Sequence, residues 1–580
     1  MRVPSIPPSP TQRLLTDAFR GYNHTLTPAD GELYDTENLS AEDFPALSTR
    51  KRRAVKKTFT APGGLKEKDA LCYVENGTLY VNDLPTGLTG LSSAPKQMVS
   101  MGAYLVIFPD RRYYNTADPT DFGALEATFT VSGLIRYAPC DLDGHEYSIR
   151  TSGGSAPENP TNGDIWLDTA SNTLNRYSDA AGIWTGIETV YTRVTLPSQG
   201  QVPAQFRAFD GVSISGLAFD QLNGDKLLYA LGGETGTTDD YLVLVGLCGT
   251  AATVEGSVTL ERRVPEMDYV VECQNRLWGC FYGHDGGKTL NEIYCCALGD
   301  FKNWRQYQGL STDSWTASVG SDGQWTGAVS YLGHPVFFKE NRVHTVTVSA
   351  VGAHRIDETA CTGVQKGSGK SLCVVGDTLY YKGRSDVFAW QGGFPTPIGQ
   401  ALGDARYSNA VGGAYGGNYY LSMQGEDGAW NLFVFDTKKA LWYREDSLHA
   451  LDFAAVGDEL WCLDANNRLL AINGTEGTPE TALPWRFETG RLTFEYPDRK
   501  YLGRCDLRLS MDSTGWAQVF LEYDSSGEWL PGGYIRLTGT GSVSVPIRPR
   551  RCDHFRICLE GEGEMKLFSL TRVIEVGSDG

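Results

Sequence analysis

Residues 374–381 read VVGDTLYY, and DVFAW follows at 386–390. An apolar pair, a Gly-Asp turn and an aromatic run are thus followed by a second turn and an aromatic strand. The pattern returns as AVGDELWC at 455–462, followed by LLAI at 469–472. Gly-Asp supplies the positive backbone angles of a tight turn, and β-branched and aromatic residues favour strands, so each copy predicts a β-hairpin.

Looser copies occur at residues 73–80, 270–278 and 330–338. Hairpins that recur at intervals of roughly 40 to 50 residues are typical of four-stranded blades arranged radially in a β-propeller. We therefore predict an all-β protein. It consists of a β-propeller, an inserted small β module and a C-terminal antiparallel β-sandwich.

The predicted boundaries follow changes in composition. Residues 1–62 carry scattered apolar side chains without a steady period, which predicts an extended arm that docks on its own body or on a neighbouring subunit. The arm residues expected to make that contact are Tyr22, Leu33, Tyr34, Leu39, Phe44 and Leu47. The other predicted parts are the propeller at 63–127 and 205–483, the insert at 128–204 and the sandwich at 484–580.

The predicted insert contains Trp166, Tyr177 and Trp184 among turn residues. Two interpretations stay open. Aromatic side chains beside Asn and Asp can contact a glycan, or the tryptophans can be the core of a tiny sheet that has little else to bury.

Composition excludes several classes of protein. The 580 residues include 67 Gly, 11% are aromatic and 21% are charged, which suits a large all-β chain with many turns. The net charge of −19 argues against binding of nucleic acid by the body as a whole. The basic run RKRR at 50–53 is either a solvated turn or a local contact with a phosphate or an acidic neighbour.

No apolar run approaches the roughly 18 residues of a membrane helix, so we expect no membrane insertion. The first eight residues lack an apolar signal core, so we also expect no export by the usual route. The number of cysteines is odd, at 13, and Cys295 and Cys296 are adjacent. This pattern predicts small buried strand residues in a reducing cytoplasm rather than disulfide bridges.

No motif predicts catalysis. The sequence has no Gly-x-Ser-x-Gly elbow, no His-Glu-x-x-His and no phosphate-binding loop. His334, His344 and His354 recur at intervals of ten, a spacing that chance produces easily in a repeat of short strands. We therefore expect no catalytic residue, no metal site, no cofactor and no enzymatic activity.

Several segments resemble virion proteins of tailed bacteriophages and prophages of Gram-positive bacteria. The resemblance begins with GYNH at 21–24, GELYDTENLS at 31–40 and FPALSTR at 44–50. It continues at 291–304 and 546–554. The order of arm, propeller and sandwich is similar to that of tail hub or nozzle proteins, also called stabilisation proteins. The insert and the heavier basic run depart from that layout.

The resemblance implies a structural tail component in a ring around the DNA channel, which assembles and stabilises the tail. The implied partners are copies of itself, other tail or connector proteins, and genomic DNA that passes during ejection without specific binding. The implied location is the virion, after assembly in the host cytoplasm. Two alternatives stay open: a carbohydrate-binding receptor or adhesin of the virion, and a propeller glycosidase.

Overall fold

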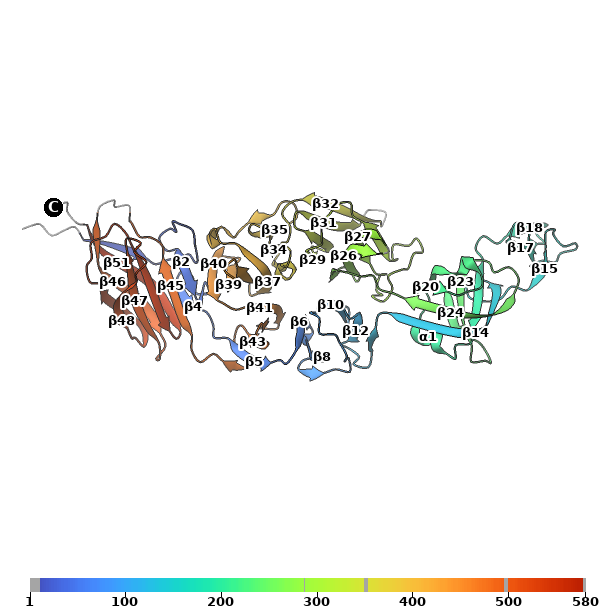
Figure 1. The fold of residues 1–580 in the computed structure, drawn as a ribbon, viewed down its shortest axis with the longest axis horizontal. Coiled ribbons are helices and arrows are strands. Elements are labelled where there is room, and N and C mark those ends of the chain that lie inside the picture. Colours follow the sequence, from blue (N-terminus) through green and yellow to red (C-terminus); the bar gives the residue numbers. More distant parts are fainter. Residues whose placement is uncertain (1–10, 286, 349–352, 495–498, 577–580) are drawn as a thin grey trace, which may run out of the picture.

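The computed structural model describes residues 11–285, 287–348, 353–494 and 499–576. Nearly every regular element is a β-strand, which confirms the predicted all-β class. The helical elements of the described residues are short: α1 (Gln201–Gln205) and the 3-10 turns η1 (Asp220–Leu222), η2 (Gly369–Ser371) and η3 (Gln400–Leu402). Sandwich, propeller and insert follow one another along the long axis of the molecule (Figure 1).

The propeller consists of seven blades in the described part of the chain. Blade 1 contains β6 (Pro62–Lys68), β7 (Ala70–Glu75), β8 (Thr78–Val81) and β9 (Leu84–Pro85), and blade 2 contains β10 (Gln97–Met101), β11 (Tyr104–Phe108), β12 (Arg112–Asn115) and β13 (Phe122–Ala124). Blade 3 contains β25 (Tyr269–Glu272), β26 (Leu277–Asp285), β27 (Lys288–Cys295) and β28 (Trp315–Ser318), and blade 4 contains β29 (Gly327–Tyr331), β30 (His334–Lys339), β31 (Arg342–Val348) and β32 (His354–Ala360).

The other three blades follow the same antiparallel order. Blade 5 contains β33 (Cys373–Val375), β34 (Thr378–Lys382), β35 (Val387–Trp390) and β36 (Thr396–Pro397), and blade 6 contains β37 (Tyr407–Tyr415), β38 (Asn418–Gly425), β39 (Trp430–Asp436) and β40 (Leu441–Asp446). Blade 7 contains β41 (Ala450–Val456), β42 (Glu459–Asp464), β43 (Arg468–Ala471) and β5 (Ala54–Thr58), with β44 (Thr478–Pro479) at its edge.

The hairpins predicted from the repeated phrase form as expected. Gly376 and Gly457 occupy the tight turns of blades 5 and 7 with φ of 65° and 57°. The ring closes where β6 contacts both β10 and β41. Strand β5 is the fourth strand of blade 7 and pairs with β43, so a segment from near the start of the chain completes the last blade.

One loop contacts blades that are not its direct neighbours in the sequence. Lys370, in η2 between blades 4 and 5, donates to Asp452 of blade 7 at 3.2 Å. Gly369 lies beside Tyr269 of blade 3. The turn η2 therefore contacts first strands of blades on both sides of its own position in the ring.

The sandwich is built from both ends of the described chain. One sheet contains β3 (Leu39–Ser40), β4 (Leu47–Thr49), β51 (Met565–Val576), β46 (Lys500–Met511) and β49 (Gly539–Pro546), with β1 (Thr11–Thr16) paired to β51. The other contains β2 (Leu33–Glu37), β45 (Pro484–Thr489), β50 (Phe555–Glu562), β47 (Trp516–Tyr523) and β48 (Leu530–Ile535).

From residue 11 onward the predicted arm docks on the chain's own body, one of the two expected outcomes, but its assignment as a part separate from sandwich and propeller is corrected. Leu33, Leu39 and Leu47 are buried in the sandwich core, and Tyr22 is buried in blade 6 against Phe433. Strands β2 and β4 pair with partners more than 400 residues away in the sequence. A local hydrophobic period therefore could not predict them.

The inserted part is larger than the predicted 128–204. Strand β14 (Ala127–Cys140) leaves blade 2 and pairs along its length with β24 (Ala252–Arg262), which leads into blade 3. Residues 205–262 thus belong to the insert and not to the propeller. The seven-stranded sheet also holds β19 (Tyr191–Leu196), β20 (Gly211–Ser215), β21 (Gly224–Leu227), β22 (Ala230–Gly233) and β23 (Asp240–Val245).

The basic run at residues 50–53 forms ion pairs within the chain. In the basic run 50–53, Arg50 pairs with Glu480 at 2.8 Å and Arg53 with Glu445 at 2.6 Å. Both arginines are buried, so neither side chain is solvated or free for nucleic acid.

All 13 cysteines are free thiols, and all but Cys361 and Cys373 are buried. Within the described ranges, no helix has the length and apolar character of a membrane span.

Candidate functional site

A small four-stranded sheet lies at the end of the molecule opposite the sandwich (Figure 1). Its strands are β15 (Ile149–Gly153), β16 (Ile165–Asp168), β17 (Thr173–Ser178) and β18 (Ile183–Gly186). We call it the tip sheet. Successive side chains of a strand point to opposite faces, so strand register separates its two surfaces.

One face of the tip sheet packs onto the rest of the insert. Its core residues are Ile165, Leu167 and Leu174, and Leu167 lies opposite Leu174 across β16 and β17. Partly buried Val190 and Leu247 pack against them. The core of the tip sheet is therefore aliphatic.

The other face carries the three aromatic side chains that the sequence singles out. Trp166 lies on this face because it alternates with Ile165 and Leu167, and Tyr177 lies opposite Trp184 across β17 and β18. The ring centroids of Trp166 and Trp184 are 5.7 Å apart, and those of Tyr177 and Trp184 are 5.3 Å apart. The indole nitrogen of Trp166 donates to the carbonyl of Gly153 at 3.0 Å, which fixes its ring.

Neither Trp166 nor Trp184 belongs to the aliphatic cluster, but Trp166 is itself buried, so the interpretation as core still applies to Trp166. Trp166 is 9% exposed and lies against Trp184, while Tyr177 and Trp184 are half-buried. We call these three residues the aromatic face. Asn175 lies opposite Trp166 in the register and adds an amide to the same surface.

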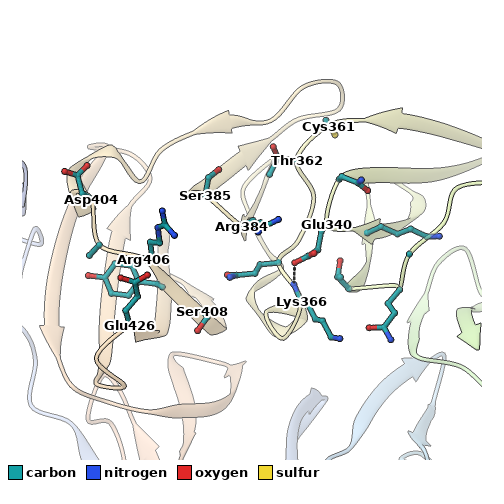
Figure 2. A pocket seen from close by; sticks show the side chains of 18 of the residues that line it. Glu340, Cys361, Thr362, Lys366, Arg384, Ser385, Asp404, Arg406, Ser408 and Glu426 are labelled. Carbon is teal, nitrogen blue, oxygen red and sulfur yellow. Dashed lines mark hydrogen bonds between the residues drawn. The ribbon is translucent and has the colours of Figure 1, made fainter.

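A second concave feature lies on the propeller. In each blade the loop from the preceding blade and the loop between the second and third strands meet at the same edge, because the strands alternate in direction. Such loops of blades 4, 5 and 6 enclose a cleft of about 1360 Å³, shown in Figure 2, which we call the mouth cleft. Its charged lining residues are Asp322, Lys339, Glu340, Lys366, Arg384, Asp404, Arg406 and Glu426.

Hydrogen bonds hold part of this lining in place. Lys339 is buried, and its ammonium donates to Asn291 Oδ1 at 3.0 Å and to the carbonyl of Ser321 at 2.5 Å. Burial lowers the pKa of Lys339. Glu340 accepts the backbone N–H of Lys366 at 3.1 Å, the dashed contact in Figure 2. Sequence reasoning missed this cleft, since its residues come from loops of three blades with no common motif.

The other predicted contact residues do not meet at a site. Of the six arm residues, Tyr22, Leu33, Leu39 and Leu47 are buried within this chain. Tyr34 is half-buried and its ring stacks on His24 at 4.1 Å, whereas Phe44 is 40% exposed. Their predicted role in holding a neighbouring subunit is therefore corrected, because most of their apolar surface is used inside the chain.

The three histidines at intervals of ten lie on successive strands of blade 4. His344 is fully buried, and its Nε2 lies 2.9 Å from Ser321 Oγ and 3.2 Å from Glu358 Oε2. Burial lowers the pKa of His344. A nucleophile–base–carboxylate relay uses both ring nitrogens, whereas both contacts here fall on one, so this group is not arranged as such a relay.

Potential metal ligands gather once among the described residues, in the exposed loop of Asp141, Asp143 and His145. The carboxylate of Asp141 already accepts the backbone N–H groups of Asp143 and His145. None of the three histidines considered in the sequence belongs to this group.

Comparison with models of known protein families gives no match, and comparison with curated proteins gives none either. Among solved structures, the chain matches the exo-β-1,3-galactanase of Phanerochaete chrysosporium at 9% identity and a TM-score of 0.22, over 52% of this chain and 94% of that one. It matches a glycoside hydrolase family 43 arabinoxylan arabinofuranohydrolase of Bacillus subtilis at 8% and 0.18, over 53% and 95%.

A third match is Trypanosoma rangeli sialidase in complex with sialic acid, at 10% identity and a TM-score of 0.24, over 98% of this chain and 96% of that one. At such identities the likeness concerns the fold alone. The prediction that this chain is not an enzyme is nevertheless corrected. It rested on the absence of catalytic motifs, and the matched structures are a galactanase, an arabinofuranohydrolase and a sialidase.

Proposed function

We propose that this chain is a carbohydrate-binding protein that presents the aromatic face of the tip sheet to a glycan. One observation carries the proposal. The sheet buries aliphatic residues on one face and keeps Trp166, Tyr177 and Trp184 together on the other. Two of these rings, Tyr177 and Trp184, are only half-buried, so part of their surface is accessible to a ligand.

The chemistry of the aromatic face suits a sugar ring. A pyranose has C–H groups on one side that pack against an aromatic surface, and hydroxyl groups at its rim that need hydrogen-bonding partners. Trp184 and Tyr177 supply half-buried rings, and Asn175 supplies an amide beside them. The fixed indole of Trp166 supports Trp184 from one side.

The positions of the sandwich and the tip sheet at opposite ends of the molecule support the same proposal. The first and last described strands, β1 and β51, pair with each other in the sandwich. The tip sheet lies at the opposite end of the long axis (Figure 1). The chain can therefore be held through its sandwich while the aromatic face stays accessible.

Isothermal titration of the full chain with oligosaccharides from bacterial walls and capsules tests the proposal. Trp184→Ala is expected to weaken binding about fivefold to tenfold, since a lost aromatic contact costs on the order of 1 kcal/mol. Ile183→Ala is the matched control. Ile183 is the neighbouring residue in β18, 57% exposed, and lies on the opposite face. Equal affinities of the two variants and the parent would contradict the proposal.

The same samples decide whether binding is followed by hydrolysis. Release of reducing ends from a bound glycan would make the chain a propeller glycosidase. Charge-neutral variants of the mouth-cleft carboxylates Asp404 and Glu426 would then show whether the cleft takes part.

A structural role in a phage tail is a second proposal. It is favoured by the in-line arrangement of sandwich, propeller and insert, together with the net charge of −19 that keeps DNA from adhering. Sedimentation or native mass measurement of the purified chain tests it. A closed ring of many copies of the 63.5 kDa chain would support a hub around a DNA channel, whereas a monomer at high concentration would count against it.

A further inference from the structure

We propose that the mouth cleft is a second binding site, separate from the tip sheet, and that it holds an acidic oligosaccharide by its carboxylate or phosphate groups. The site is framed by three cations that lie on successive loops around blade 5: Lys366 before it, Arg384 within it and Arg406 after it.

These cations have no carboxylate partner. Among the described residues, no side-chain hydrogen bond or ion pair is formed by Lys366, Arg384 or Arg406, and all three are exposed. The chain has 70 acidic and 51 basic residues, and many of its cations pair with an acid. Arg262, for example, pairs with Asp210 at 2.7 Å. Three adjacent unpaired cations in one cleft are therefore available to an anion.

The carboxylates of the cleft divide into two kinds. Asp322 accepts the hydroxyl of Tyr282 at 2.6 Å and the N–H of Gly323, and Glu340 accepts the N–H of Lys366. The carboxylates of Asp322 and Glu340 therefore already accept hydrogen bonds within the chain. Within the described part of the chain, the carboxylates of Asp404 and Glu426 form no hydrogen bond or ion pair, and both residues lie with Arg406 on the blade-6 side of Figure 2.

This mixture defines the ligand class. Guanidinium and ammonium groups bind carboxylates and phosphates, whereas free carboxylates accept hydrogen bonds from hydroxyl groups. A molecule that offers both anions and hydroxyls satisfies the whole lining, and an acidic oligosaccharide does so. A simple polyanion without hydroxyls would meet repulsion at Asp404 and Glu426.

The size of the cleft indicates several sugar units. Its volume of about 1360 Å³ exceeds the roughly 300 to 1,000 Å³ of sites for single small molecules. The buried ammonium of Lys339, held by Asn291 and Ser321, adds a fixed positive charge to the wall. The cleft therefore fits a stretch of a charged polymer better than one free anion.

The test uses the full chain and three probes: an oligogalacturonate, an oligomer of poly(glycerol phosphate), and a neutral glucan of similar length. We expect at least one anionic probe to bind, and the neutral glucan to bind at least about tenfold more weakly. The anionic probe that binds tells whether carboxylate or phosphate is the natural group. Binding should weaken when salt rises from about 0.05 to 0.5 M, because the cations are exposed.

The decisive variant is Lys366→Gln, Arg384→Gln and Arg406→Gln together. The matched control is Lys438→Gln, Arg508→Gln and Arg548→Gln, which changes the net charge equally at exposed cations outside the cleft. We expect the first variant to lose at least about tenfold in affinity for the anionic probe and the control to keep it. Because all six residues are exposed, both variants should fold as the parent does.

Two results would overturn the proposal: failure of the parent to bind either anionic probe, and equal affinities of the two triple variants. Trp184→Ala separates this site from the tip sheet. If the mouth cleft is an independent site, Trp184→Ala keeps the affinity for the anionic probe even when it loses the glycan of the tip sheet.

Discussion

Arg53 Nη2 lies 2.6 Å from Glu445 Oε2, and this buried ion pair joins the strand that closes the propeller to blade 6. Arg53 directly precedes β5, and its other amino group donates to Asp446 at 2.5 Å. Removing one partner of a buried pair leaves the other charge without compensation. We expect Arg53→Ala to lower the free energy of unfolding by about 3 to 5 kcal/mol, measured by urea denaturation.

Lys51→Ala is the control for this prediction. Lys51 lies two residues away and pairs with Glu42 at 3.3 Å, but both side chains are 56% exposed. Its loss should change stability by about 1 kcal/mol or less. Equal small effects of the two substitutions would show that the buried pair does not hold the closing strand.

Asp30 and Arg572 give a prediction about pH. Arg572 is buried and donates to both carboxylate oxygens of Asp30, at 2.7 and 2.8 Å. Burial raises the pKa of Asp30, but the hydrogen bond and charge of Arg572 outweigh it and hold the pKa below the usual value. A depressed folded pKa stabilises the protein above the unfolded pKa near 4, and this contribution is lost as pH falls through the folded pKa.

Asp30→Asn should therefore destabilise the protein by about 1 kcal/mol at pH 7, a modest value because the Asp30 side chain is half exposed. The difference between variant and parent should shrink below pH 4. Thermal denaturation at several pH values measures it. A difference that is constant from pH 7 to pH 3 would mean that the ion pair contributes nothing.

The repeated phrase predicted the blades because a hairpin is local. Residues 374–381 and 455–462 contain their own turn and both strands, so their pattern is visible in one short window. The sandwich is different. Leu47 pairs with Leu567, and only the folded chain brings these two strands together. The end of the insert could not be predicted either, because β14 pairs with a strand more than 100 residues later in the sequence.

The two candidate sites differ in the same way. Trp166, Tyr177 and Trp184 fall within 20 residues, so the sequence could single them out, although it could not say which face of the sheet they occupy. The cations of the mouth cleft come from three loops, one before blade 5, one within it and one after it. No spacing marks them, because their meeting point depends on the closed ring of blades.

Truncation tests the corrected boundary of the N-terminal segment. Leu33, Leu39 and Leu47 lie in the sandwich core, where each large-to-small substitution should cost about 2 to 5 kcal/mol. We expect Leu47→Ala to be strongly destabilising and removal of residues 1–50 to give aggregated protein. Leu26→Ala is the control, since Leu26 is 79% exposed and should change stability by about 0.5 kcal/mol or less. If the truncated chain is soluble and unfolds cooperatively, residues 1–50 are not part of the core and the prediction of a separate arm is supported.

The joint between insert and propeller depends on the absence of a side chain at Gly211. A Cβ built there would lie 2.2 Å from the carbonyl oxygen of Arg305 and 2.4 Å from its carbon, and backbone atoms cannot rotate away. The same region is held by hydrogen bonds, from Gly211 N to Asn303 Oδ1 at 3.1 Å and from Asn303 Nδ2 to the carbonyl of Phe209 at 2.7 Å.

Gly211→Ala should therefore push the insert away from blade 3 and cost about 1 to 3 kcal/mol, as overpacking of a close contact does. The segment around residues 205–211 that carries this contact, and the connection at 263–268 between insert and blade 3, should then be cut faster by protease, as mass spectrometry of the fragments can show. Gly153→Ala is the control, because no atom lies within 4 Å of a Cβ there. If both variants are cut at the rate of the parent, the joint tolerates the displacement and is not fixed by the Gly211 contact.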